Sequence, residues 1–308
     1  MPDCCICYIA NEGYLFGTLL GALQAKRLVS PELADIAIFS FGEQGRESAA
    51  VSAVCSAEGI AFIHVPMAVL EGADFRYARL LLHRFAPARY GQLLYIDGDT
   101  QVTSSLDELV RLTPAPGRFA VVRDPLVFDI HQDTKFATRQ RKRLKALGIR
   151  TTDFERYFNS GVLRINRDGW DDIGARAMAA YRADPKAMVN FDQDALNIVA
   201  IDRCDHISVR WNFPAYLLDL GLDLAVSPAI IHFMAQPKPW HGAFPPWGSR
   251  WHRPYLDMAI RHPSVACFRP QMRRAAYGRY LVQQVYKRLW GDRRHLRTVV
   301  RGWGASPI

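Results

Sequence analysis

The stretch QLLYIDGD (92–99) carries the strongest structural signal in this chain. Its first five residues form a short apolar run, which predicts a buried strand. The run ends on an acid, a glycine and a second acid. Three similar runs precede it, and helix-like segments separate them. We expect strands at 4–10, 35–41, 60–65 and 92–97, and helices at 17–28, 47–59 and 75–86.

An alternating order of strands and helices predicts an α/β fold, with a mostly parallel central sheet and helices on both faces. Such sheets bind ligands at the carboxyl ends of their strands. After Asp99 the pattern is looser, and the segment 135–147 fits either a helix or a mobile loop. We expect one catalytic domain over 1–250 and a basic helical tail over 251–308. The later strands are expected at 118–124, 157–166 and 228–233, and the later helices at 171–182 and 192–200.

The chain has 308 residues, of which 49% are hydrophobic, enough for a sizeable core. No run approaches the 18 apolar residues of a membrane span. The N-terminal residues MPDCCICYIANEG lack the basic and apolar regions of a secretory signal, so we expect a cytoplasmic protein. Cys4 and Cys7 would point to opposite faces of a strand, which favours buried small residues over a metal or redox pair.

The net charge of +9 is concentrated in two segments. Ten Arg or Lys and one acid lie between Arg269 and Arg301, and seven bases without an acid lie between Lys135 and Arg150. A basic helix with Tyr and Trp at its margins suits an anionic membrane surface, so residues 269–303 are expected to bind one. A helix packed on the domain with a solvated basic face is the alternative. No base-reading motif accompanies the charge, so no nucleic acid partner is expected.

Asp97 and Asp99 stand two residues apart at a strand end, so their carboxylates point the same way. Two adjacent carboxylates are costly unless a cation neutralises them, and hard oxygen ligands suit Mg²⁺ or Mn²⁺ bound together with phosphates. Gly98 leaves room for a ligand beside the backbone. The alternative is a solvated surface loop.

Three further segments carry candidate site residues. His232 could complete a metal site and Lys238 could hold phosphate as a point charge, although a lone histidine is more often structural. Asn159 lies in a turn of small residues that could approach a ligand or simply begin a strand. Asp192 and Gln193 begin a helix, where an acid could serve only as a cap.

Taken together, YIDGDTQV (95–102), YFNSGVLRIN (157–166), FDQDALN (191–197) and IHF…KPWH (231–241) resemble the family-8 retaining glycosyltransferases. That group includes glycogenin and bacterial lipopolysaccharide galactosyl- and glucosyltransferases. The resemblance spans roughly residues 4 to 242. It implies a Rossmann-like, nucleotide-sugar-binding fold of the GT-A type, and transfer of glucose or galactose from a UDP-sugar.

The resemblance also implies roles for individual residues. Metal, usually Mn²⁺, would be bound by Asp97, Asp99 and His232. The transferred hexose would contact Arg79, Asp124, Asn159, Asp192 and Gln193. The nucleotide and diphosphate would contact Ala10, Asn11, Tyr14, Gly98 and Lys238.

Two positions depart from the family pattern. Ala235 stands where the family has a glycine, and a positive φ there would strain its methyl group. The first-strand turn, Ala10 to Gly13, lacks the aspartate expected for the uracil or ribose.

The expected activity is a metal-dependent, retaining hexosyl transfer to a saccharide acceptor at the inner face of the membrane. The acceptor is expected to be lipid-linked and of the lipopolysaccharide type. Gln193 and Asp192 are the catalytic candidates, and front-face attack with Gln193 stabilising the cation-like sugar is favoured. The basic run from Lys135 either lines the acceptor side or is a solvated helix face. The alternatives are a self-glucosylating protein like glycogenin and an inactive sugar-nucleotide-binding protein.

Overall fold

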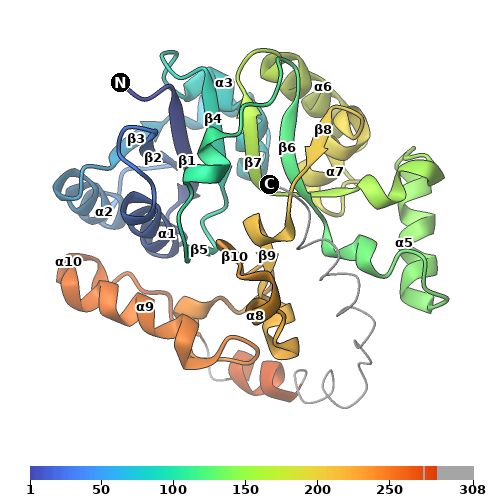
Figure 1. The fold of residues 1–308 in the computed structure, drawn as a ribbon. Helices are drawn as coiled ribbons and strands as arrows, with labels where there is room; N and C mark the ends of the chain where they lie inside the picture. Colours follow the sequence, from blue (N-terminus) through green and yellow to red (C-terminus); the bar gives the residue numbers. More distant parts are fainter. Residues whose placement is uncertain (273–274, 283–308) are drawn as a thin grey trace.

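The computed structural model describes residues 1–272 and 275–282 of the chain. Its centre is a seven-stranded sheet with the order β3-β2-β1-β4-β7-β6-β8 (Figure 1). Neighbouring strands are parallel except where β7 is involved, because β7 runs antiparallel to both β4 and β6. The predicted mostly parallel sheet is therefore confirmed. The strands are β1 (Cys4–Asn11), β2 (Ala34–Phe41), β3 (Ala61–Val65), β4 (Gln92–Ile96), β6 (Phe119–Arg123), β7 (Phe158–Asn166) and β8 (Cys204–His206).

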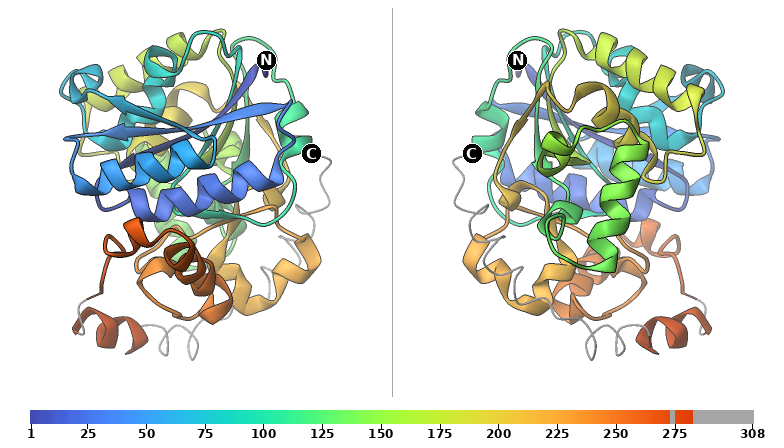
Figure 2. Two further views of the ribbon diagram at one scale, coloured as in Figure 1. Left: turned by 90° about the vertical axis from the view of Figure 1, so that its left-hand side faces the viewer. Right: turned by 90° about the vertical axis from the view of Figure 1, so that its right-hand side faces the viewer.

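Helices cover both faces of this sheet (Figure 2). Strand β1 shows why its sequence is apolar throughout: Cys4 and Ile6 face one core, and Cys5 and Cys7 face the other. These cysteines are buried and unpaired, as expected for small core residues. The first core is covered by α1 (Leu15–Leu28), α2 (Arg46–Ala57) and α4 (Asp107–Arg111), and the second by η2 (Phe75–Leu81), α3 (Leu82–Phe85), α6 (Trp170–Ala183) and α7 (Phe191–Ala200).

The single helix predicted over 75–86 is wrong in detail, because most of this segment forms the 3₁₀ helix η2. The reason lies in its packing against α6. The Arg79 carbonyl accepts a hydrogen bond from Trp170 Nε1 at 3.3 Å, and a Cβ atom at Gly174 would lie only 2.1 Å from the Leu80 carbonyl oxygen. The backbone of η2 is thus in direct contact with α6.

The basic segment after residue 134 is a helix, α5 (Lys135–Ala146), and not a mobile loop. Thr134 caps it by accepting a hydrogen bond from the Ala137 N–H at 3.1 Å. Figure 1 shows α5 at the right-hand edge of the molecule, outside the layers that cover the sheet.

A second, small sheet has the order β5-β10-β9. Its pairing is antiparallel between β5 and β10, with His232 opposite Thr100. The Phe233 N–H donates to the Asp99 carbonyl at 2.9 Å, which brings His232 next to the end of β4. The strands are β5 (Thr100–Val102), β9 (Phe213–Pro214) and β10 (Ile230–His232).

Helices α9 (Gly248–Arg261) and α10 (Pro263–Ala266) pack the C-terminal part against the rest of the molecule, below α1 (Figure 1). Residues 275–282 are helical, and the buried Tyr280 donates its hydroxyl to the Pro245 carbonyl at 2.6 Å. The rest of the predicted tail, 283–308, lies outside the described residues. Among the described helices, none has the length and hydrophobicity needed to cross a bilayer. The remaining elements are η1 (Met67–Leu70), η3 (Pro125–Phe128), η4 (Thr151–Arg156), η5 (Val209–Trp211), η6 (Ala215–Leu220), α8 (Leu222–Val226) and η7 (Pro239–His241).

Candidate active site

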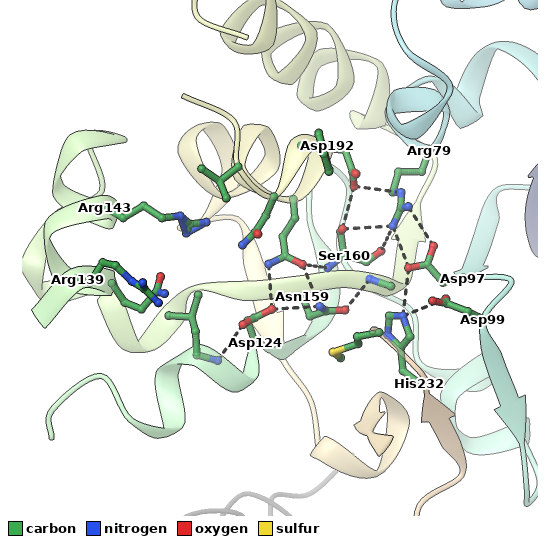
Figure 3. A pocket seen from close by; sticks show the side chains of 18 residues that line it. Arg79, Asp97, Asp99, Asp124, Arg139, Arg143, Asn159, Ser160, Asp192 and His232 are labelled. Atoms are coloured by element: carbon green, nitrogen blue, oxygen red, sulfur yellow. Dashed lines mark hydrogen bonds and ion pairs between the residues drawn. The ribbon is translucent and has the colours of Figure 1, made fainter. Parts of the chain in front are cut away.

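A cavity of about 690 Å³ opens at the carboxyl end of β4, where the parallel sheet was expected to bind its ligand (Figure 3). The antiparallel strand β7 begins at this point, so its first residues meet the end of β4. The first turn of α7 and the end of β10 complete the walls. The helices η2 and α5 and the residue after β6 also line the cavity, so the structure gathers segments that are far apart in the sequence. They contribute Arg79, Asp97, Asp99, Asp124, Asn159, Asp192, Gln193 and His232 to the lining.

Asp97, Asp99 and His232 place one ligand atom each within 4.8 Å of one another. His232 Nε2 lies 3.1 Å from Asp99 Oδ1 and 3.6 Å from Asp97 Oδ2. Two carboxylates and an imidazole nitrogen are a donor set that fits a divalent cation, with positions left for phosphate oxygens. The residues present therefore fit the predicted metal.

The orientation of His232 is fixed by a chain of amide hydrogen bonds. Asn212 donates from Nδ2 to Asn159 Oδ1 at 2.8 Å, so its own Oδ1 faces His232 Nδ1 at 2.9 Å. An acceptor at that position assigns the proton to Nδ1 and leaves the Nε2 lone pair facing the two carboxylates. This is the tautomer that a metal ligand requires. Asn212 was missed in the sequence, where only its place between the buried Trp211 and Phe213 could have indicated a structural polar group.

Lys238 lies beside the same carboxylates and is almost completely buried. Its ammonium group is 2.5 Å from Asp99 Oδ2 and donates to the Phe233 carbonyl at 2.7 Å. Burial alone would raise the pKa of Asp99, but the adjacent Lys238 ammonium group outweighs it and holds that pKa well below its usual range. Asp99 is therefore ionised. The strain considered for Ala235 is absent, because Ala235 does not have a positive φ.

Arg79 connects the metal residues to α7. Its Nη2 atom lies 3.0 Å from Asp97 Oδ1, and its Nε atom lies 3.1 Å from Asp192 Oδ2. Ser160 adds a hydroxyl donor to Asp192 at 2.8 Å. Burial raises the pKa of Asp192 to about 6, although Arg79 opposes the shift. Arg79 thus fixes the carboxylates of Asp97 and Asp192 relative to each other.

The middle of the cavity holds a polar cluster suited to sugar hydroxyls. Gln193 Nε2 donates to Asp124 Oδ2 at 2.9 Å, and Asn159 Nδ2 donates to the same oxygen at 3.1 Å and to Gln193 Oε1 at 2.9 Å. Burial raises the pKa of Asp124. Carboxylate and amide groups fixed in this way can accept from and donate to several hydroxyls at once.

Three of the five predicted nucleotide and diphosphate residues line a second cavity of about 490 Å³, which shares Arg79, Asp97 and Asp99 with the first. Asn11, Tyr14 and Gly98 line it together with Asp74, Phe75, Arg76 and Tyr95. Ala10 does not line it, since its side chain lies in the core under α1.

Comparison with known proteins accounts for this arrangement. The family model described as Glycosyl transferase family 8 matches residues 72–243, more than half of the chain. The chain belongs to glycosyltransferase family 8. The matched range includes every lining residue listed above for the first cavity, and Lys238 as well, whereas Asn11 and Tyr14 precede it.

Relatives of this family-8 chain include general stress protein A of Bacillus subtilis, 29% identical over 189 residues, or 56% of this chain and 58% of the relative. The lipopolysaccharide 1,3-galactosyltransferase of Salmonella typhimurium is 25% identical over 181 residues, or 55% of this chain and 50% of the relative. The chain thus matches only about half the length of these curated relatives.

Among solved structures, the galactosyltransferase LgtC in complex with donor and acceptor sugar analogs has a TM-score of 0.65 and 22% identity, covering 82% of this chain and 95% of LgtC. The bifunctional glycosyltransferase WbbM has a TM-score of 0.68 and 17% identity, covering 85% of this chain and 50% of WbbM. At these identities the likeness shows the fold, which is the expected GT-A type.

Proposed function

We propose that this protein is a retaining hexosyltransferase that moves glucose or galactose from a UDP-sugar to a saccharide acceptor and requires Mn²⁺ or Mg²⁺. One observation carries the proposal. Asp97, Asp99, His232 and Lys238 converge at one end of a cavity whose middle carries the hydroxyl-binding cluster of Asp124 and its neighbours. A diphosphate can bind at the metal end, and a hexose can bind next to it in the middle of the cavity.

The difficult step is cleavage of the bond between the anomeric carbon and the diphosphate oxygen, because the leaving group gains negative charge. A divalent cation held by Asp97, Asp99 and His232 would act there as a Lewis acid. The Lys238 ammonium group lies at the same carboxylates and can stabilise the departing phosphate. Removal of one such contact typically costs ~3 kcal/mol, or about two orders of magnitude in rate.

Retention requires either a covalent sugar–enzyme bond or attack by the acceptor on the face that the diphosphate leaves. Asp192 is held by Arg79 and Ser160, which draw on its electron pairs and make it a weak nucleophile. The Gln193 amide is a weak nucleophile by nature. We therefore favour front-face attack, in which the Gln193 amide dipole stabilises the cation-like sugar.

We propose a lipid-linked saccharide of the lipopolysaccharide type as the acceptor, on the basis of the Salmonella relative's name. The positive charge of segment 269–303 supports attachment of the protein to the cytoplasmic face of an anionic membrane. In this proposal the segment belongs to a tail that follows the catalytic domain over 1–250. Co-sedimentation of the protein with phosphatidylglycerol vesicles should decrease as the salt concentration rises. Equal co-sedimentation with neutral vesicles would remove the support for an electrostatic anchor.

Donor hydrolysis tests the proposed chemistry without knowledge of the acceptor. UDP release from UDP-glucose and UDP-galactose is measured with Mn²⁺ and with EDTA, in the wild type, in Asp99→Asn and in the control Asp205→Asn, whose exposed carboxylate pairs with Arg118. We expect release that needs Mn²⁺ and is lost in Asp99→Asn alone. Metal-dependent UDP binding without any release would indicate an inactive binding protein, and hexoses added to the protein's own mass would indicate self-glucosylation.

A further inference from the structure

The end of the first cavity opposite the metal residues is basic. Arg139, Gln140 and Arg143 of α5 line it, and Figure 3 shows both arginines pointing toward Asp124 from the side away from His232. The donor's diphosphate belongs at the metal end, so these two cations lie beyond the hexose. A saccharide acceptor whose hydroxyl attacks on the diphosphate face, and which extends past the hexose, would bring its other groups to this end.

Arg143 has hydrogen-bonding capacity that the protein leaves unused. Its Nη2 atom contacts the fully buried Asp194 at 2.6 Å and the Tyr157 hydroxyl at 3.2 Å. Its Nε and Nη1 atoms are buried and have no hydrogen-bond partner in the described part of the chain. Arg143 therefore stands at the cavity wall with part of its donor capacity not taken up by the described residues.

Arg139 has no carboxylate partner within residues 1–272 and 275–282. Its described contact is with the Phe136 ring, whose centroid lies 5.8 Å from the guanidinium carbon. Helix α5 contains six Lys or Arg and no acid, so the helix itself does not neutralise this charge. The cavity thus has an acidic end that suits a cation and a basic end that suits an anion.

We propose that the acceptor is a saccharide that carries an anionic group, a phosphate ester or a carboxylate, bound by Arg139 with help from Arg143. This inference rests on the proposed hexosyl transfer and adds the chemical class of the acceptor. The planar guanidinium fork matches both anions with paired, charge-assisted hydrogen bonds. A neutral glycan would make no charge-assisted hydrogen bonds with the exposed Arg139 guanidinium.

Binding measurements can test the anion site independently of catalysis. The protein is saturated with Mn²⁺ and UDP, so that an anionic sugar cannot occupy the diphosphate end. Galactose, galactose 6-phosphate and galacturonic acid are then titrated calorimetrically into the wild type, Arg139→Gln and Lys142→Gln. Lys142 is a matched control, because it is an exposed cation of α5 that does not line the cavity.

We expect the wild type to bind at least one anionic sugar roughly tenfold or more tightly than galactose. Arg139→Gln should remove that preference, and Lys142→Gln should keep it. Tighter binding of galactose 6-phosphate would identify the anionic group of the acceptor as a phosphate ester, and tighter binding of galacturonic acid would identify it as a carboxylate. Equal affinity for neutral and anionic sugars, no binding of either anionic sugar across the millimolar range, or equal losses in both variants would overturn the proposal.

The same preparation separates this inference from the proposed function. Failure of the wild type to release UDP from either UDP-hexose would count against hexosyl transfer. The calorimetric comparison of Arg139→Gln with Lys142→Gln would still judge the anion site by itself.

Discussion

Replacing Lys238 by methionine should lower stability and activity while strengthening metal binding. Methionine keeps most of the apolar stem, so the change removes mainly the ammonium group that lies 2.5 Å from Asp99 Oδ2. Both side chains are largely buried, and loss of one partner of a buried ion pair costs about 3–5 kcal/mol. For a domain of this size we expect the melting temperature without metal to fall by about 10 °C.

A divalent cation should reverse much of that loss. Without Lys238, the carboxylates of Asp97 and Asp99 lack one positive neighbour, so they should bind Mn²⁺ more tightly. A ligand at 100 times its Kd stabilises a protein by about 2.7 kcal/mol, and the tighter site reaches that value at a lower Mn²⁺ concentration. Donor hydrolysis should nevertheless fall by about two orders of magnitude, because the leaving diphosphate loses a cation.

The assay is thermal unfolding over a series of Mn²⁺ concentrations, with UDP release measured on the same samples. Lys145→Met is the control, since it removes an exposed lysine of α5. The reasoning would be refuted if Lys238→Met melted like the wild type without metal. It would also be refuted if Mn²⁺ raised both melting temperatures equally.

Three other predictions follow from the site. Burial raises the pKa of Asp192 to about 6, so donor hydrolysis should rise as the pH is raised through that value, and Asp192→Asn should lack this rise. Because the pKa of Asp192 is higher in the folded than in the unfolded protein, its protonation contributes to the free energy of unfolding, and this contribution is lost as the pH rises through about 6. Urea unfolding of Asp192→Asn should not show that loss. A Cβ atom at Gly161 would lie 2.3 Å from His232 Cε1, so Gly161→Ala should weaken Mn²⁺ binding roughly 10- to 100-fold in calorimetry; unchanged affinity would contradict the assigned ligand. Arg143→Gln leaves the fully buried Asp194 unpaired and should lower the free energy of unfolding by about 3 kcal/mol, and a loss well below that would show that water or other donors replace the arginine.

The central fold was predictable because the strands at the middle of its sheet are buried on both faces. Such strands have continuous apolar sequences, and each of the first four was predicted to within two residues of its observed ends. The segment 75–86 was less predictable, because its 3₁₀ conformation depends on close contact with Trp170 and Gly174 of α6. Local helix propensity contains no information about that contact.

The acidic end of the site was predictable from the strand that stops at Asp97. The position of His232 beside it was implied by the family resemblance and not by local sequence, because it depends on pairing between β5 and β10, which lie about 130 residues apart in the chain. Asn212 likewise has no sequence signal of its own. The ion pair of Lys238 with Asp99 was not expected from the sequence, whereas the phosphate contact that the resemblance implies stays a prediction.

The most direct test of hexosyl transfer with retention is to follow UDP-glucose and UDP-galactose by proton NMR, with water as the acceptor. With Mn²⁺ present, we predict that one donor is cleaved between its anomeric carbon and the diphosphate, and that the free hexose first appears in the donor's own anomeric configuration. EDTA should stop the reaction. First appearance of the opposite anomer would contradict retention, and equally fast cleavage in EDTA would contradict the metal site at Asp97, Asp99 and His232.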